Sequence, residues 1–203
     1  MNYLAHLLIA EHTQSSLIGN FLGDFVKGPV ERLEYSEDIK QGIRLHRAID
    51  TFTDTHAVFL QSKSRMTPAR RRYAGIIIDL AYDHFLSISW SEFAGSNREA
   101  FIAGFYVSLE ENMRWLPERC SRMAKPMILS DWIGRYAHLE GVSDSLNGIS
   151  GRINRQFKRD NPLYNAIEEV ESNYEALHQD FLAFFPKLIQ FSEKKILTFT
   201  EKH

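Results

Sequence analysis

Cysteine is almost absent from this chain: Cys120 is the single cysteine among 203 residues. One thiol cannot form an intrachain disulfide, and it excludes a zinc site built from several cysteines, which fits a reducing compartment. Positive charge is not in excess either, because the formal net charge is −2. The protein therefore lacks the global basic field that attracts nucleic acid.

Long hydrophobic runs are also missing. No segment of the sequence approaches the roughly 18 apolar residues that a membrane span needs. The apolar stretch MNYLAHLLIAEH is short, lacks a basic region and is interrupted by His6, Glu11 and His12, so it does not resemble a signal peptide. We therefore expect a cytoplasmic protein that binds neither a membrane nor nucleic acid.

Alternation of the kind found in β-strands is scarce, and helical periodicity dominates instead. Ser15 or Ser16, Ser36, Thr67 with Pro68, and Asn97 provide helix starts. The pattern predicts seven to nine helices in one compact all-α domain over residues 1–203. The expected helices cover about 3–12, 17–26, 37–54, 68–90, 98–116, 125–139, 143–153, 163–185 and 187–199.

Several of these apolar helices carry polar pairs spaced four residues apart, which share one face of a helix. An unpaired buried carboxylate is costly, so these charges need a partner or a wet cleft. Carboxylates and imidazoles together form the ligand set of a divalent metal, and Mn²⁺ or Mg²⁺ fits better than structural zinc. The pairs are Asn2 with His6, Asn20 with Asp24, His46 with Asp50, and Asp79 with Asp83.

Each single pair also has an ordinary explanation. His46 could be a core histidine with satisfied hydrogen bonds, and Asp50 could pair with Arg47 on a solvated face. His84 lies about 100° around the helix from Asp83, so it faces elsewhere. The sequence contains neither an HExxH motif nor a P-loop that would decide the matter.

Basic residues cluster near these pairs. Arginines at the start of a helix oppose its dipole, and this unfavourable arrangement suggests docking of an acidic partner or a phosphate. An ordinary solvated basic loop is the alternative. The basic residues are Lys27, Arg44 and Arg47, followed by Arg65, Arg70, Arg71 and Arg72 in SRMTPARRRYAG.

Five motifs occur in an order typical of one known family. MNYLAH, GNFLGDFVKG, HRAIDTFTD, DLAYDHFL and LNGI, spread over about residues 1–150, resemble the acyl carrier protein phosphodiesterases. The resemblance implies an all-α fold distantly related to the HD phosphohydrolases. The usual HD enzymes contain an adjacent His-Asp dyad, whereas this chain has only the reversed order, in Asp83-His84.

The resemblance also implies a reaction: hydrolysis of the phosphodiester between 4′-phosphopantetheine and a serine of acyl carrier protein, with a divalent cation that is usually Mn²⁺. Asp24, His46, Asp50, Asp79 and Asp83 are then the expected metal ligands, with Asn20 beside them. Lys27, Arg44 or Arg47 would stabilise charge on the phosphoryl oxygens, and His6 or His84 would protonate the leaving serine. Arg65, Arg70, Arg71 and Arg72 would dock the acidic carrier protein.

Two other functions remain open at this point. A metal phosphohydrolase of the same fold could act on a small nucleotide, and it would need no large basic docking surface. A helical adaptor could bind an acidic partner without catalysis, and it would need no metal.

Overall fold

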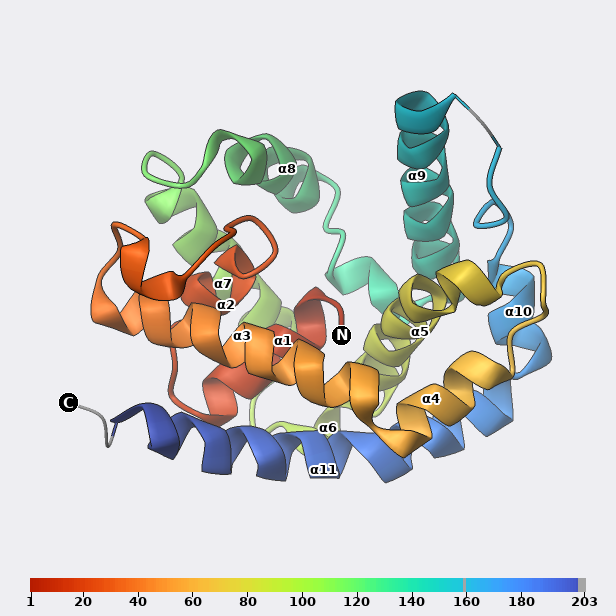
Figure 1. Cartoon of the computed structure of the whole chain (residues 1–203), viewed down its shortest axis with the longest axis horizontal. Helices are drawn as coiled ribbons and strands as arrows, with labels where there is room; N and C mark the ends of the chain where they lie inside the picture. The colour runs from red at the N-terminus through yellow and green to blue at the C-terminus, as the bar shows by residue number, and fades with distance from the viewer. Residues whose placement is uncertain (159, 201–203) are drawn as a thin grey trace.

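The computed structural model describes residues 1–158 and 160–200, which contain helices and no strand. The all-α expectation is therefore confirmed for these residues. Figure 1 shows the arrangement of the eleven α-helices that they form. These are α1 (Tyr3–His12), α2 (Leu17–Leu22), α3 (Glu37–Thr55), α4 (Ala57–Ser64), α5 (Ala74–Ile88), α6 (Trp90–Phe93), α7 (Arg98–Asn112), α8 (Glu118–Leu129), α9 (Leu139–Phe157), α10 (Ile167–Ser172) and α11 (Tyr174–Thr200). Three short 3₁₀-helices are η1 (Val30–Arg32), η2 (Arg71–Tyr73) and η3 (Gly134–Ala137).

Helix α1 lies at the centre of the fold. Its residues Leu4 to Ala10 are all buried, because the segment is apolar on every side. Figure 1 shows α3 and α11 crossing in front of and below it, while α8 and α9 lie above the chain start on either side. Helix α11 contacts α1, α3, α4 and α5, so the last helix closes the core that the first one begins.

Two glycines allow α2 and α3 to approach closely. A Cβ atom on Gly19 would lie 2.5 Å from the backbone oxygen of Ile39, and one on Gly42 would lie 2.8 Å from Cα of Gly19. Real Cβ atoms do not come this close to backbone atoms, so a side chain at either position would push the helices apart. This contact holds α2 against the first half of α3.

Most predicted helices are present, but several boundaries differ. Helix α2 ends at Leu22 rather than near Val26. Thr67 does not cap α5, because its backbone N–H and hydroxyl both donate to Glu169, and α5 starts only at Ala74. The helix expected over about 125–139 is absent, because α8 ends at Leu129 and only the short η3 follows. Helix α9 starts at Leu139 rather than near residue 143, and α11 continues through Pro186. Helix α4, which follows α3 directly, was not predicted from the sequence.

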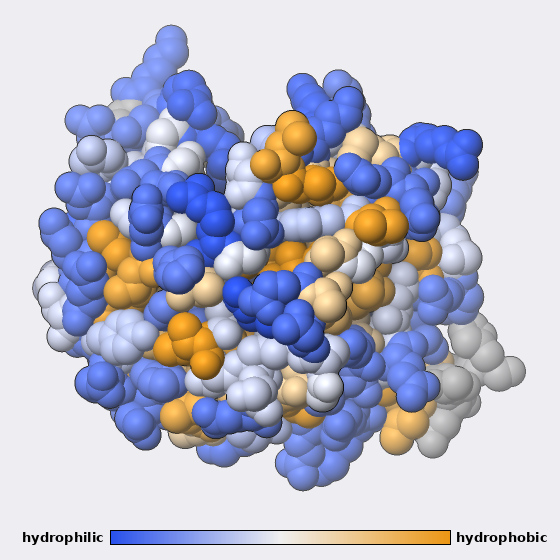
Figure 2. All heavy atoms as spheres, turned by 180° about the vertical axis from the view of Figure 1, so that it is seen from behind, coloured by the Kyte–Doolittle hydropathy of each residue, from blue (hydrophilic) through white to orange (hydrophobic). Residues whose placement is uncertain are grey.

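The surface of the protein is mostly hydrophilic. On the face seen in Figure 2, hydrophobic side chains are scattered among polar ones. Within residues 1–158 and 160–200, no helix combines the length and the hydrophobicity that crossing a membrane requires.

Candidate metal centre and adjoining cleft

Two imidazoles and a carboxylate meet between α1 and α3. Nε2 of His6 lies 3.1 Å from Oδ1 of Asp50, and Nε2 of His46 lies 3.1 Å from Oδ2 of the same carboxylate. The two imidazole rings stack with their centroids 4.0 Å apart. Potential ligand atoms of these three residues all lie within 4.8 Å of one another, so they can hold a metal ion. We call them the His–Asp cluster.

The charges of the cluster are strongly coupled. Burial would lower the pKa of His46, but the carboxylates of Asp24 and Asp50 outweigh it and raise this pKa to about 9. Burial and the neighbouring His46 lower the pKa of His6 to about 4. Burial opposes ionisation of Asp50, yet the two histidines hold its pKa well below its usual range. One imidazolium therefore shares the anionic site with a neutral imidazole at neutral pH.

Local sequence explains how this cluster forms. His46 and Asp50 are one helical turn apart on α3, so both face α1. Gly23 leaves room for the ring of His46, since a Cβ atom there would lie 2.2 Å from that ring. Arg47 donates hydrogen bonds to the carbonyls of Gly28 and Val26 at 2.7 and 3.3 Å and so ties the loop after α2 to α3.

More carboxylates surround the cluster. Oδ1 of Asp24 lies 3.6 Å from Nε2 of His46. The amino group of Met1 lies 3.0 Å from Asp79 and 3.7 Å from Asp50, so a cationic nitrogen bridges two of the carboxylates. Burial raises the pKa of Asp79 although this amino group opposes the shift. Two imidazoles and several carboxylates without a thiolate form a donor set that fits the divalent cation expected from the resemblance.

The other half of the predicted Asp79–Asp83 pair has a different role. Asp83 is fully buried and accepts hydrogen bonds from the backbone N–H groups of Leu4 and Ala5 at 2.8 and 3.1 Å. It thus caps the first turn of α1 from a neighbouring helix. We therefore leave Asp83 out of the proposed ligand set.

His84 and Asn20 are also held by structural contacts. Nδ1 of His84 donates to the carbonyl of Tyr136 at 2.8 Å, and Nε2 lies 2.9 Å from the hydroxyl of Tyr174, which fixes the ring between other elements. The amide nitrogen of Asn20 donates to Oγ of Ser15 and to the carbonyl of Ser16. His6, expected as a general acid, lies in the His–Asp cluster.

The basic residues expected to contact phosphate lie outside the cleft beside the cluster. Arg44 pairs with Glu31 and Glu37 on the surface. Lys27 is exposed in the loop after α2, and Arg47 holds that loop as described.

The expected docking arginines fall into two groups. Arg65 binds both oxygens of Asp180, and Arg70 bonds to the carbonyl of Pro162 and pairs with glutamates of α10. These two hold the fold together. Arg71 and Arg72 are exposed in η2 and remain candidates for docking.

A cleft of about 720 Å³ adjoins the cluster, and we call it the metal-side cleft. Asp24 and Asp79 line it on one side, and three arginines from α8 and α9 line it as well: Arg119, Arg122 and Arg152. The sequence analysis missed Arg119 and Arg122 because α8 carries none of the recognised motifs. It missed Arg152, although this residue follows the LNGI motif by three positions on α9, because nothing local indicates that it faces the cleft. Arg119 and Arg122 share a face of α8 through their i,i+3 spacing, but such a pair is ordinary without the cleft beside it.

Comparison with known proteins finds relatives that match this chain over most of its length. A family model described as acyl carrier protein phosphodiesterase matches residues 1–188. Relatives of that name include proteins from Photorhabdus laumondii subsp. laumondii, 34% identical over 96% of both chains, and from Yersinia enterocolitica, 32% identical over 96% of this chain and 99% of the relative. A third, from Pectobacterium atrosepticum, is 31% identical over 97% of this chain and all of the relative. No solved structure matches the chain. The chain belongs to the acyl carrier protein phosphodiesterase family.

Proposed function

We propose that this protein hydrolyses the phosphodiester between 4′-phosphopantetheine and a serine of holo acyl carrier protein. The products are the apo carrier protein and 4′-phosphopantetheine. The observation that carries the proposal is the His–Asp cluster beside a cleft with arginines, in a chain of this family.

His6, His46 and Asp50 would hold a divalent cation, for which we propose Mn²⁺ or Mg²⁺, with Asp24 and Asp79 close by. Such an ion, when bound, lowers the pKa of a water ligand and polarises a phosphoryl oxygen. Asp24 lines the cleft, where its carboxylate can orient the attacking water by accepting a hydrogen bond. We assign proton transfer to the leaving serine oxygen to Asp79, because its carboxyl group lines the same cleft and burial raises its pKa against the opposing effect of the Met1 amino group.

The negative charge that develops on the phosphoryl oxygens is stabilised by the three arginines of the metal-side cleft, Arg119, Arg122 and Arg152. We assign this role to them rather than to Lys27, Arg44 and Arg47, which lie outside the cleft. The three arginines line the same cleft as Asp24 and Asp79, opposite in charge to the phosphoryl oxygens that a substrate would bring there. Guanidinium groups suit phosphate oxygens because their donors match the geometry of that group. Among the described residues, neither Arg119 nor Arg152 forms an ion pair that would compete.

We also propose that the fold is a distant branch of the HD phosphohydrolases. His46 and Asp50, four residues apart on α3, bring together the two residue types that an adjacent His-Asp dyad supplies. A cytoplasmic location and docking of the acidic carrier protein by Arg71 and Arg72 belong to the same proposal. Docking of this kind mainly speeds encounter and weakens with salt.

An intact-mass assay tests the function. Holo acyl carrier protein is incubated with the enzyme and Mn²⁺, and separately with EDTA, using the wild type, Asp50→Asn and Asp38→Asn. Asp38 is an exposed carboxylate on the same helix, so it is a matched control. We expect loss of the phosphopantetheine mass only with metal and only in the wild type and Asp38→Asn. Intact holo protein with folded, metal-loaded wild type would overturn the proposal and favour a nucleotide substrate.

A further inference from the structure

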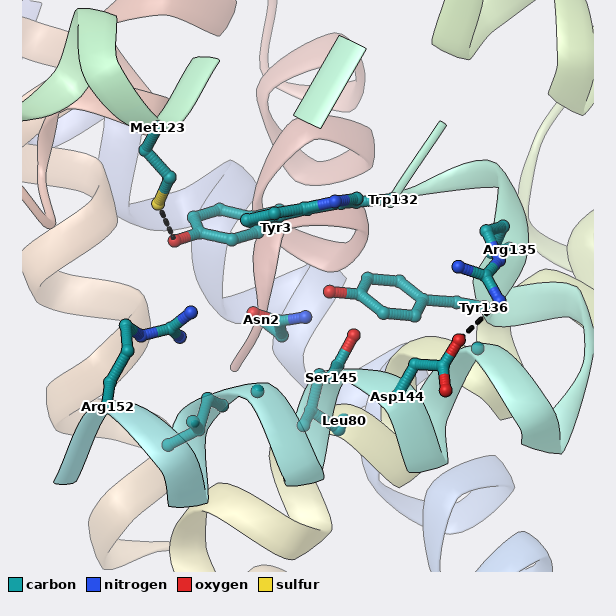
Figure 3. Close-up of a pocket in the computed structure, with 13 residues that line it drawn as sticks. Asn2, Tyr3, Leu80, Met123, Trp132, Arg135, Tyr136, Asp144, Ser145 and Arg152 are labelled. Atoms are coloured by element: carbon teal, nitrogen blue, oxygen red, sulfur yellow. Dashed lines mark hydrogen bonds and ion pairs between the residues drawn. The ribbon is translucent and has the colours of Figure 1, made fainter. Parts of the chain in front are cut away.

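A second cavity opens next to the metal-side cleft, and Figure 3 shows its lining. Its volume is about 190 Å³, and we call it the tyrosine pocket because Tyr3 and Tyr136 line it. Pockets for drug-sized ligands usually enclose about 300–1,000 Å³, so this one suits a slender group rather than a fused ring system. The tyrosine pocket contains none of the proposed metal ligands.

The tyrosine pocket and the metal-side cleft are continuous. Seven residues line both, among them Asn2, Tyr3, Trp132 and Arg152. Figure 3 shows Arg152 at one end of the tyrosine pocket and the Arg135–Asp144 ion pair at the other. A molecule with its phosphate near Arg152 can therefore extend from the metal-side cleft into the tyrosine pocket.

The lining of the tyrosine pocket is apolar with a few polar groups. Leu80, Trp132 and Ile149 provide apolar surface. In the middle, the side chains of Asn2, Tyr136 and Ser145 point towards one another (Figure 3). The amide nitrogen of Asn2 is buried and close enough to the Tyr136 hydroxyl to lower the pKa of that phenol, but it forms no hydrogen bond of good geometry with the described residues.

The two tyrosines keep their protons at neutral pH. Burial raises the pKa of Tyr136 to about 12, and it raises that of Tyr3 further, while the charge of Arg152 opposes both shifts. Both phenols can therefore donate hydrogen bonds. Among the described residues, the hydroxyl of Tyr3 donates only to the sulfur of Met123, which lies 3.5 Å away and is a weak acceptor.

We propose that the tyrosine pocket binds the pantetheine arm of the substrate and thereby selects it, an inference that rests on the proposed function. The arm is a chain of methylene and methyl groups interrupted by two amides, so it needs apolar walls and a small number of donors and acceptors. Leu80, Trp132 and Ile149 contact the hydrocarbon parts, while Asn2 and Tyr136 bond to the amides. The thiol end points towards Arg135 and Asp144.

Arg152 is the positioning residue of this arrangement. It lines both cavities, and its guanidinium binds the phosphoryl group where the arm leaves the metal-side cleft. A phosphodiester without the arm would leave the tyrosine pocket unfilled and the buried amide of Asn2 unpaired. The enzyme therefore distinguishes phosphopantetheinyl serine from other phosphodiesters by contacts far from the reacting phosphorus.

Gly148 offers a way to fill the tyrosine pocket without disturbing the fold. It lines the pocket from α9, and a Cβ atom there would meet only Nη1 of Arg152, at 4.0 Å. Gly148→Leu adds bulk to the pocket, and leucine favours a helix over glycine by about 1 kcal/mol. Gly104→Leu is the matched control, because Gly104 is exposed on α7 and a Cβ atom there meets nothing within 4 Å.

The experiment measures binding of pantetheine, without its phosphate, by calorimetry, together with kcat and KM for holo acyl carrier protein and the Kd of Mn²⁺. We expect the wild type and Gly104→Leu to bind pantetheine alike. In Gly148→Leu, we expect pantetheine binding to weaken and KM to rise, each about tenfold or more, because one misplaced methylene already changes specificity about 10–200-fold. The Kd of Mn²⁺ should stay unchanged.

Two outcomes overturn the inference: wild type that does not bind pantetheine, or equal binding and equal KM in both variants. Failure of the proposed function is a separate result, because it appears as wild type that does not hydrolyse holo carrier protein under any condition. Pantetheine binding that depends on Gly148 would support the pocket even then.

Discussion

Arg65→Ala is the most direct test of how the basic segment after α4 is used. Arg65 donates from Nε and Nη2 to the two oxygens of Asp180, at 2.8 and 3.1 Å. The side chain of Asp180 is only 9% exposed, and that of Arg65 is 27% exposed. The pair joins the end of α4 to α11, so we expect its loss to reduce stability rather than carrier-protein docking.

The magnitude follows from these contacts. Breaking a buried ion pair by removing one partner costs about 3–5 kcal/mol, because the other charge stays buried without compensation. Ser62 and Gln61 still donate to Asp180 in the variant, at 2.9 and 3.2 Å, so part of its charge remains satisfied. We therefore expect a loss of about 2–4 kcal/mol in the free energy of unfolding. A loss of about 3 kcal/mol lowers the Tm by about 6–12 °C in a protein of this size.

Urea denaturation followed by circular dichroism measures this loss, with Arg71→Ala as the control. Arg71 is exposed in η2, and its removal should change stability by less than about 0.5 kcal/mol. Arg65→Lys should recover part of the loss, since lysine keeps the charge but cannot form both hydrogen bonds in the same geometry. A stability of Arg65→Ala equal to that of the wild type, with a raised KM for carrier protein, would refute the reasoning and restore Arg65 as a docking residue.

Three further predictions concern the residues around the metal centre. The pKa of His46 is raised to about 9 in the metal-free protein, so binding of the metal at pH 7 should release a proton, and the affinity for the metal should rise about tenfold per pH unit until about pH 9. Calorimetry in buffers of different ionisation enthalpy measures the proton release. Binding enthalpies that are identical in all buffers would contradict it. The same raised pKa stabilises the metal-free fold fully below pH 6.5, and that contribution is lost as the pH rises through about 9. Asp83→Ala leaves the buried N–H groups of Leu4 and Ala5 without acceptors, so it should lower the free energy of unfolding, measured by urea denaturation, by about 2–4 kcal/mol. A decrease below about 0.5 kcal/mol would show that the capping role of Asp83 is unimportant.

Sequence periodicity predicted the elements whose signals are local. Helix α1 matches its expected range, and Asn97 caps α7 by accepting from the N–H of Ala100, as the pattern indicated. Spacing also predicted that His46 and Asp50 share a face of α3. Both predictions depend on residues within one or two turns of a single helix, which is the range over which a sequence pattern carries direct physical meaning.

Predictions failed where the decisive partner is distant along the chain. Arg65 and Arg71 look alike in SRMTPARRRYAG, yet Arg65 meets Asp180, 115 residues away. Thr67 looked like a helix cap, but Glu169 takes both of its donors from 102 residues away. The arginines of the metal-side cleft were missed for the same reason, because only the packing of α8 and α9 near α1 brings them to the site.

The position of α11 at the end of the chain has a consequence for how the protein is made. Its side chains Phe181, Phe184 and Phe185 are fully buried, and the helix contacts α1 and α3, which carry the His–Asp cluster. Contacts between segments this distant form slowly, because the intervening loop must close first. On the ribosome, α1 and α3 emerge long before α11, so their apolar faces stay exposed to solvent while the residues up to α11 are translated. We expect the nascent chain to depend on chaperones during this interval, and its metal centre to become rigid only after α11 has been translated.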